Sequence, residues 1–180
     1  SMVWTHAEWS AHGSLEELVP IDSVLTGLRR RKDAAEVARM TEAARLASLA
    51  LASACIEAGV TEREIRDELE STMRAHGADG PSYETIVASG PENAAMAHHR
   101  PTSRALVEGD TVVIDVGALL DGYHSDMTRT FIVGEPSPEQ ERWYRVLARA
   151  QQAGLEAVRA GVGTCDVDAA CRAVLAEEGL

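Results

Sequence analysis

One segment of the sequence permits few folds, because it reads as a strand, a tight turn and a second strand in direct succession. Residues 111–117 read Thr-Val-Val-Ile-Asp-Val-Gly, a nearly continuous β-branched run that is typical of a buried strand. Asp121-Gly122 follows, and this dipeptide is a strong signal for a two-residue hairpin turn. Residues 123–133 then read as the returning strand, so the segment predicts an antiparallel hairpin.

Each strand of this hairpin carries an aspartate, Asp115 on the first and Asp126 on the second. With the turn centred on Asp121-Gly122, Asp115 faces Thr128 across the hairpin. Asp126 then lies diagonal to Asp115. With the turn one residue earlier, the two aspartates face each other directly. Either register places both carboxylates on one face, roughly 5–8 Å apart.

Two carboxylates this close repel each other, by about 3 kcal/mol at a separation near 5 Å and an effective dielectric constant near 20. The folded chain must offset that repulsion, either with a proton on one carboxylate or with a divalent cation between the two. In the alternative interpretation, Asp126 pairs with Arg129 at the surface and Asp115 makes a buried hydrogen bond. The spacing alone leaves both interpretations open.

Helical patterns lie on both sides of the hairpin. Capping-box patterns at residues 33–36 and 61–64 predict a long helix to Ala58 and a shorter one that ends at Gly77. Gly59 is the predicted stop between them.

The rest of the chain adds a strand and a second pair of helices. Residues 84–89 predict the strand, Ser137 opens a third helix to about Ala160, and residues 167–178 predict a fourth. Residues 1–31 read as irregular. The fold class is therefore α+β, an antiparallel sheet flanked by helices.

The second pair of helices looks like a repeat of the first. Ala160-Gly161-Val162 and Gly179 follow Ala58-Gly59-Val60 and Gly77 at one constant offset. An internal repeat implies that one unit buries its face against the other.

Composition narrows the classes of function. The 180 residues carry a net charge of −12, so the basic face of a nucleic-acid binder is not expected. No run of about 18 apolar residues is present, so no membrane span is expected. The odd, sparse set of Cys55, Cys165 and Cys171 is no disulfide framework, and we interpret these residues as buried thiols. With no visible signal peptide, this predicts a reducing, cytoplasmic location.

The stretch from about Lys32 to Pro136 resembles the catalytic domain of the aminopeptidase P and prolidase family, which has a pita-bread fold. The matching motifs are Arg30-Arg-Lys-Asp33 with Glu36, Ile86-Val-Ala-Ser-Gly90, Asn93-Ala-Ala-Met-Ala-His98, Pro101-Thr102, Glu108-Gly-Asp110, Ile114-Asp-Val-Gly117, Gly122-Tyr123, Ser125-Asp-Met-Thr-Arg-Thr-Phe131 and Val133-Gly134. The resemblance implies the first half of that fold.

The resemblance also implies a metal site and a reaction. In this family the first hairpin aspartate chelates one metal ion and the second bridges two, which implies these roles for Asp115 and Asp126. Manganese is the expected metal, with cobalt and zinc as alternatives. The family's histidine ahead of the hairpin contacts the substrate near the scissile bond, and its distance from Pro101-Thr102 matches His98 rather than His99. The implied activity is hydrolysis of the bond between an amino-terminal residue and proline, in a peptide or a dipeptide.

The family completes its metal site with a histidine and two glutamates from the second half of its catalytic domain, and no candidates for them precede Leu180. We therefore expect residues 1–31 to be a linker or the remnant of an amino-terminal domain. Residues 32–180 are expected to form a partial catalytic domain, the first pseudo-repeat plus the helices of the second. We expect this chain to bind metal weakly, to lack peptidase activity alone, and to form a homodimer through an uncovered apolar face.

Three alternatives share the fold. A methionine aminopeptidase has the same aspartate pair, although residues 92–101 look closer to the Xaa-Pro branch. A non-catalytic peptide-binding module and a metal-independent, creatinase-like hydrolase are the others. Asp115 and Asp126 argue against both of these for the intact protein, whereas this chain alone remains compatible with binding without catalysis.

Overall fold

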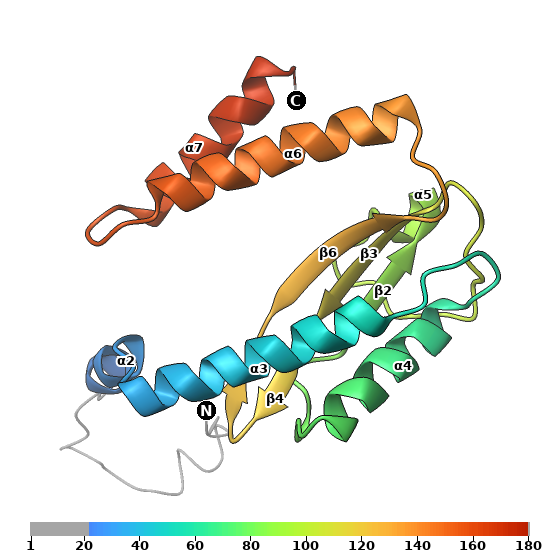
Figure 1. Cartoon of the computed structure of the whole chain (residues 1–180). Helices are drawn as coiled ribbons and strands as arrows, with labels where there is room; N and C mark the ends of the chain where they lie inside the picture. Colours follow the sequence, from blue (N-terminus) through green and yellow to red (C-terminus); the bar gives the residue numbers. More distant parts are fainter. Residues whose placement is uncertain (1–21, 180) are drawn as a thin grey trace, which may run out of the picture. The chain divides into compact units, whose positions relative to one another are not determined.

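A computed structural model of the protein describes residues 22–179 (Figure 1). The chain divides into two compact units, one ending at Arg39 and the other beginning at Met40. In the first unit, helix α2 (Asp22–Arg30) precedes the start of helix α3 (Ala34–Ser53). The predicted capping box at the start of α3 is confirmed, because Asp33 and Glu36 exchange backbone-to-carboxylate hydrogen bonds of 2.8 and 2.9 Å.

Helix α2 corrects the prediction that residues 1–31 are irregular. Val24, Leu25 and Leu28 recur at helical spacing within it, and this periodicity favours a helix. Residues 1–21 of the predicted irregular segment lie outside the described residues.

The second unit contains a three-stranded antiparallel sheet in the order β2–β3–β6. Its strands are β2 (Ile86–Ser89), β3 (Thr111–Val116) and β6 (Met127–Ile132). Burial alternates along β3: Val112, Ile114 and Val116 are buried, whereas the intervening residues are half-buried. Asp115 therefore lies on the more open face of the sheet, not in a strand buried on both faces as its β-branched neighbours suggested.

Helices α3 and α4 (Glu62–Ala75) cover the buried face of this sheet (Figure 1). A second capping box at Thr61 and Glu64 starts α4, as predicted. The core brings together apolar side chains of both helices and of the sheet: Leu46, Ala47, Ala50, Leu51, Ile65, Leu69, Met73, Val87, Val112, Ile114 and Val116.

Helix α3 ends at Ser53 rather than at the predicted Ala58. The apolar pattern continues beyond the helix because Ile56 packs against the core from a non-helical segment. Gly59, the predicted stop, instead adopts a left-handed conformation (φ 94°) in the turn that leads to α4.

The remaining helices are α6 (Pro138–Ala157) and α7 (Thr164–Glu177), which pack against each other. A side chain at Gly154 of α6 would lie within 2.4 Å of the Cys171 sulfur of α7, so this contact requires glycine. The interpretation of the cysteines as buried thiols is wrong for Cys55 and Cys165, which are exposed, and Cys171 is only half-buried.

The two helix pairs match in length. Helices α3 and α6 have 20 residues each, and α4 and α7 have 14 each. Gly77 and Gly179 both have positive φ after the shorter helices. These features agree with the repeat seen in the sequence, while the proposed domain boundaries stay a prediction. None of the described helices is both long and apolar enough to cross a membrane.

Candidate active site

The hairpin that carries the two aspartates has the predicted turn. Asp121 and Gly122 both have positive φ (50° and 78°), as a type I′ turn requires. Leu120 pairs with Tyr123 on either side of the turn. Further along, Asp115 of β3 pairs with Thr128 of β6. This confirms the first of the two registers considered.

The hairpin changes sheets halfway along. Its outer end forms β4 (Ala118–Leu120) and β5 (Tyr123–His124), which join β1 (Gly80–Pro81) in a second small sheet. The transition occurs at Gly117, where an added Cβ would lie 1.9 Å from the Ser125 carbonyl oxygen and 2.1 Å from the Ser82 hydroxyl. Only glycine permits this close approach of the two strands.

Ser125 fixes the second strand at the same point. Its buried hydroxyl accepts a hydrogen bond from the Ala118 amide (2.9 Å) and donates one to the Ala43 carbonyl of α3 (3.0 Å). With Ser125 held against the core, the next residue, Asp126, is exposed to solvent. The local backbone thus turns Asp126 towards the open face on which Asp115 lies.

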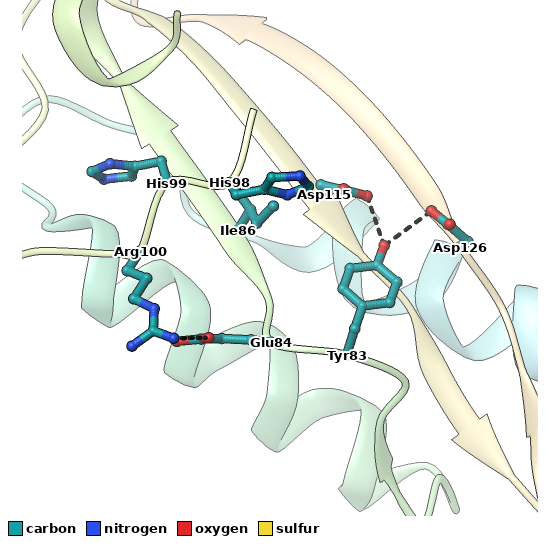
Figure 2. A pocket seen from close by; sticks show the side chains of 8 residues that line it. All are labelled: Tyr83, Glu84, Ile86, His98, His99, Arg100, Asp115 and Asp126. Carbon is teal, nitrogen blue, oxygen red and sulfur yellow. Dashed lines mark hydrogen bonds and ion pairs between the residues drawn. The ribbon is translucent and has the colours of Figure 1, made fainter. Parts of the chain in front are cut away.

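Both carboxylates converge on one phenol, that of Tyr83 (Figure 2). The Tyr83 hydroxyl lies 2.6 Å from Oδ1 of Asp115 and 3.1 Å from Oδ1 of Asp126. The Thr128 hydroxyl donates a further hydrogen bond of 3.0 Å to Asp115. The phenol has a single proton, so it can donate fully to only one of the two carboxylates at a time.

The electrostatics of Tyr83 follow from this arrangement. Burial raises the pKa of its phenol, and the hydrogen bond and negative charge of Asp115, with a smaller effect of Asp126, raise it further. A third negative charge at this point would be strongly disfavoured. Tyr83 therefore remains a neutral donor to the pair.

The alternative interpretation of the aspartates, a hydrogen-bonded Asp115 and an ion pair between Asp126 and Arg129, agrees with the structure only for Asp115. Asp115 does accept hydrogen bonds from a half-buried position. In the described part of the chain, however, Arg129 makes no ion pair with Asp126 and instead donates to the Thr128 carbonyl (2.8 Å). The exposed carboxylate of Asp126 thus keeps its charge available for another partner.

The aspartates line a cleft of about 410 Å³. Its lining residues are Tyr83, Glu84, Ile86, His98, His99, Arg100, Asp115 and Asp126 (Figure 2). The two histidines differ: His98 is exposed and its ring lies on the side of the aspartates, whereas His99 is buried and turned away from them. The Nε2 atom of His99 lies 2.9 Å from Oε2 of the buried Glu62.

The donor set suits part of a divalent metal shell. Asp115 and Asp126 offer hard carboxylate oxygens on one face of the sheet, both beside the Tyr83 hydroxyl, and Mn²⁺ and Mg²⁺ prefer ligands of this kind. Among residues 22–179, no group of three His, Cys, Asp or Glu side chains comes together in a way that could hold a metal ion. The two carboxylates therefore fit one side of such a site and leave the other side to further ligands.

Sequence reasoning did not identify Tyr83 as part of this site. No spacing rule connects it with the hairpin, since it lies 32 residues before Asp115. The one available hint is its position just after Gly80-Pro81, where the chain enters the predicted strand.

The chain is similar to known peptidases over most of its length. The profile of metallopeptidase family M24 matches residues 38–180. A curated Xaa-Pro dipeptidase of Pyrococcus horikoshii is 33% identical over 174 residues, which cover 96% of this chain and 49% of that protein.

Solved structures give the same result. An Xaa-Pro dipeptidase from Bacillus anthracis matches with a TM-score of 0.89 at 35% identity, covering 98% of this chain and 50% of the other. An X-Pro aminopeptidase from Thermotoga maritima matches with a TM-score of 0.87 at 34% identity, covering 96% and 49%. The chain spans about half the length of the relatives it matches.

Proposed function

This chain belongs to metallopeptidase family M24, and from that premise we propose that it supplies part of the active site of a metal-dependent Xaa-Pro peptidase. The substrate class is a peptide or dipeptide with proline in second position, cleaved between the amino-terminal residue and proline. The fold is α+β, with antiparallel sheets flanked by helices. It matches about half the length of each pita-bread prolidase structure.

The observation that carries the proposal is that Asp115 and Asp126 lie close enough to meet the same hydroxyl, that of Tyr83, in a cleft that His98 also lines. Carboxylates in such a position either share a proton or hold a cation. Asp126 is exposed and lines the cleft, so its carboxylate is accessible to a cation that enters it.

We assign the two carboxylates to a pair of divalent ions, with manganese expected and cobalt or zinc as alternatives. When bound, such ions polarise a peptide carbonyl and activate water at neutral pH. Thr128 and Tyr83 both donate to Oδ1 of Asp115 and so restrain the orientation of its carboxylate in the cleft.

His98 contributes an imidazole at the wall of the cleft. Its exposed ring is in a position to donate a hydrogen bond to a peptide carbonyl held near the aspartates, and so to stabilise negative charge that develops on that oxygen. His99 is unsuited to this role, because Glu62 already occupies its Nε2.

We propose further that the 180-residue chain alone is not a competent peptidase. The aspartates have no third carboxylate, histidine or cysteine grouped with them in the described residues. Losing one general base or ligand of this kind reduces rates by roughly two to four orders of magnitude.

We also propose a homodimer and a reducing, cytoplasmic setting. Large apolar side chains are exposed on or directly after α6, namely Tyr144, Leu147, Leu155 and Val158, and such surfaces favour association.

The proposed location rests on the cysteines. The three cysteines are free thiols, as expected in a reducing compartment. The proposed homodimer is tested by sedimentation at rising protein concentration, and a purely monomeric species at every concentration would contradict the dimer.

A peptidase assay with two substrates separates the proposal from its main alternative. The gene product that contains these residues is supplied with Mn²⁺ and either an Xaa-Pro dipeptide or a Met-Ala dipeptide. Preferential hydrolysis of the Xaa-Pro substrate is expected. Preference for Met-Ala would instead identify a methionine aminopeptidase, and hydrolysis of neither would favour a peptide-binding module.

A further inference from the structure

Glu62, the first residue of α4, is an ionisable side chain that the proposed reaction does not use, yet it is completely buried. A buried carboxylate is costly unless hydrogen bonds replace its lost hydration. Glu62 accepts six, three on each oxygen. On Oε1 they come from the Ser89 amide (2.8 Å), the Ser89 hydroxyl (2.7 Å) and Asn93 Nδ2 (3.0 Å); on Oε2 they come from His99 Nε2 (2.9 Å), the Thr102 amide (2.9 Å) and the Thr102 hydroxyl (2.8 Å).

These donors come from one continuous stretch of chain. Ser89 ends β2, Asn93 ends the short helix α5 (Gly90–Asn93), and His99 and Thr102 belong to the loop that follows. Glu62 therefore holds this loop near its start, near its middle and at its end. His98 lies inside the anchored stretch.

A second layer supports the same arrangement. The Ser89 hydroxyl, which donates to Glu62, accepts a hydrogen bond of 2.8 Å from Arg104. Arg104 is itself paired with the buried Asp110 (2.6 Å). The orientation of the Ser89 hydroxyl is thus supported by an ion pair with a buried carboxylate.

The adjacent histidines divide two tasks. The ring of His99 is buried against Glu62, and that of the preceding His98 projects into the cleft. Fixing the His99 ring restrains the backbone they share and so limits the positions that the His98 ring can reach. Without that restraint, His98 would belong to an exposed loop with several accessible rotamers.

We propose that Glu62 and His99 are positioning residues, which hold the loop of residues 93–102 so that His98 stays in the cleft beside Asp115. The inference rests on the proposed function for the role of His98, and on the described contacts for the restraint itself. A merely stabilising role makes a different prediction, because it would leave the motion of His98 unchanged in molecules that remain folded.

The test measures the motion of His98 directly, without metal or substrate. Backbone ¹⁵N relaxation of the 180-residue chain gives the order parameter of the His98 amide in the wild type, His99→Phe and His99→Gln. Phenylalanine keeps the buried ring but removes the hydrogen bond, whereas glutamine keeps a donor for Glu62. The amide of Ile114 in β3 is the internal control.

We expect the order parameter of His98 to fall from about 0.85 to below about 0.6 in His99→Phe, and to recover in His99→Gln, while Ile114 stays rigid. An unchanged value in folded His99→Phe overturns the proposal. If that variant does not fold, Asn93→Ala, which removes one partner of Glu62, should still give a measurable decrease at His98, and no decrease there would equally overturn it.

A peptidase assay on the same variants of the gene product separates this inference from the proposed function. We expect kcat/KM for an Xaa-Pro dipeptide to fall about 10- to 100-fold in His99→Phe and to be restored largely in His99→Gln. If the wild type hydrolyses no Xaa-Pro peptide, the proposed function fails while the relaxation data still decide the positioning role. If the loop loosens and activity is unaffected, His98 has no role in the reaction and the inference fails in its functional part.

Discussion

Tyr83 gives the shorter of its two hydrogen bonds, 2.6 Å, to Asp115, a residue 32 positions away on the central strand of the sheet. This contact makes the two aspartates unequal. Asp115 is half-buried and receives donors from Tyr83 and Thr128. Asp126 is exposed, and among residues 22–179 the one hydrogen bond to its carboxylate is the longer contact of 3.1 Å from Tyr83. Asp126 is therefore the carboxylate with more freedom to bind a cation.

The raised pKa of Tyr83 predicts a loss of stability at high pH. An unfolded chain releases the phenolic proton near pH 10, whereas burial and the neighbouring Asp115 keep it bound in the folded chain. Above pH 10 the folded state thus binds more protons than the unfolded state, so the free energy of unfolding falls as the pH rises. Urea unfolding between pH 8 and 11 should show a shallower decrease in Tyr83→Phe than in the wild type.

The control for this experiment is Tyr144→Phe, at an exposed position on α6. Its pH dependence should follow the wild type. Equal slopes in Tyr83→Phe and the wild type would mean that the phenol ionises as readily in the folded chain as in the unfolded one.

Removal of one carboxylate should weaken the metal binding of the chain. Calorimetry with Mn²⁺ should show weak binding to the wild type, since two carboxylates leave most of the metal shell to water. Asp126→Asn should bind at least about 10-fold more weakly, a change of about 1.4 kcal/mol. Asp121→Asn removes the same charge from the same hairpin, at a left-handed turn position that asparagine tolerates, and should bind as the wild type does.

A tight isotherm for two equivalents of metal that is lost only on substitution of Cys165 or Cys171 would show that the ligands lie elsewhere. Equal loss in Asp126→Asn and Asp121→Asn would point to general electrostatic attraction by an acidic chain.

Gly117→Ala should disturb the aspartate pair through the backbone. The new methyl group would collide with the Ser125 carbonyl and the Ser82 hydroxyl, so the two strands must separate where Asp126 emerges. We expect a loss of roughly 1–3 kcal/mol in the free energy of unfolding, measured by denaturant titration. Gly80→Ala is the matched control, because the nearest side-chain atom lies 4.0 Å away, and it should change stability far less.

The lowered pKa of Glu62 predicts that the fold loses stability in acid. Burial would raise the pKa of Glu62, but hydrogen bonds from His99, Ser89, Thr102 and Asn93 outweigh it and lower the pKa to about 2. The stability that this ionised carboxylate contributes is present above about pH 4.5 and is lost as the pH falls towards 2.

Glu62→Gln tests that assignment. At pH 7 its free energy of unfolding should be lower by about 1–3 kcal/mol, because the NH2 group of the new amide would face N–H and O–H groups that now donate to the carboxylate. It should therefore unfold at a lower denaturant concentration. Between pH 4.5 and 2 its stability should vary less than that of the wild type. A wild type and a variant with parallel profiles over this range would exclude Glu62 as the titrating group.

Local chemistry explains what could be predicted from the sequence. The Asp121-Gly122 turn determines the register, and the register places Asp115 opposite Thr128, so the geometry of the pair follows from a few adjacent residues. Capping boxes at residues 33–36 and 61–64 likewise involve neighbours within one turn, and these helix starts were predictable.

Contacts between distant segments explain what could not be predicted. Tyr83 contacts the aspartates only once strand β1 has paired with the hairpin. Glu62 contacts His99 only once the loop has folded back on α4. Neither contact produces a periodic pattern in the sequence. The end of α3 was misjudged for a related reason, since Ile56 continues the apolar pattern while packing from a non-helical segment.

The most direct test of the central claim is Mn²⁺-dependent hydrolysis of an Xaa-Pro dipeptide by the gene product that contains these residues. The wild type is compared with Asp126→Asn and with Asp121→Asn. We predict that Asp126→Asn lowers kcat/KM by at least about 100-fold, while Asp121→Asn stays within about threefold of the wild type. Asp126→Asn turning over at the wild-type rate would contradict the assignment of this hairpin to the catalytic metal site.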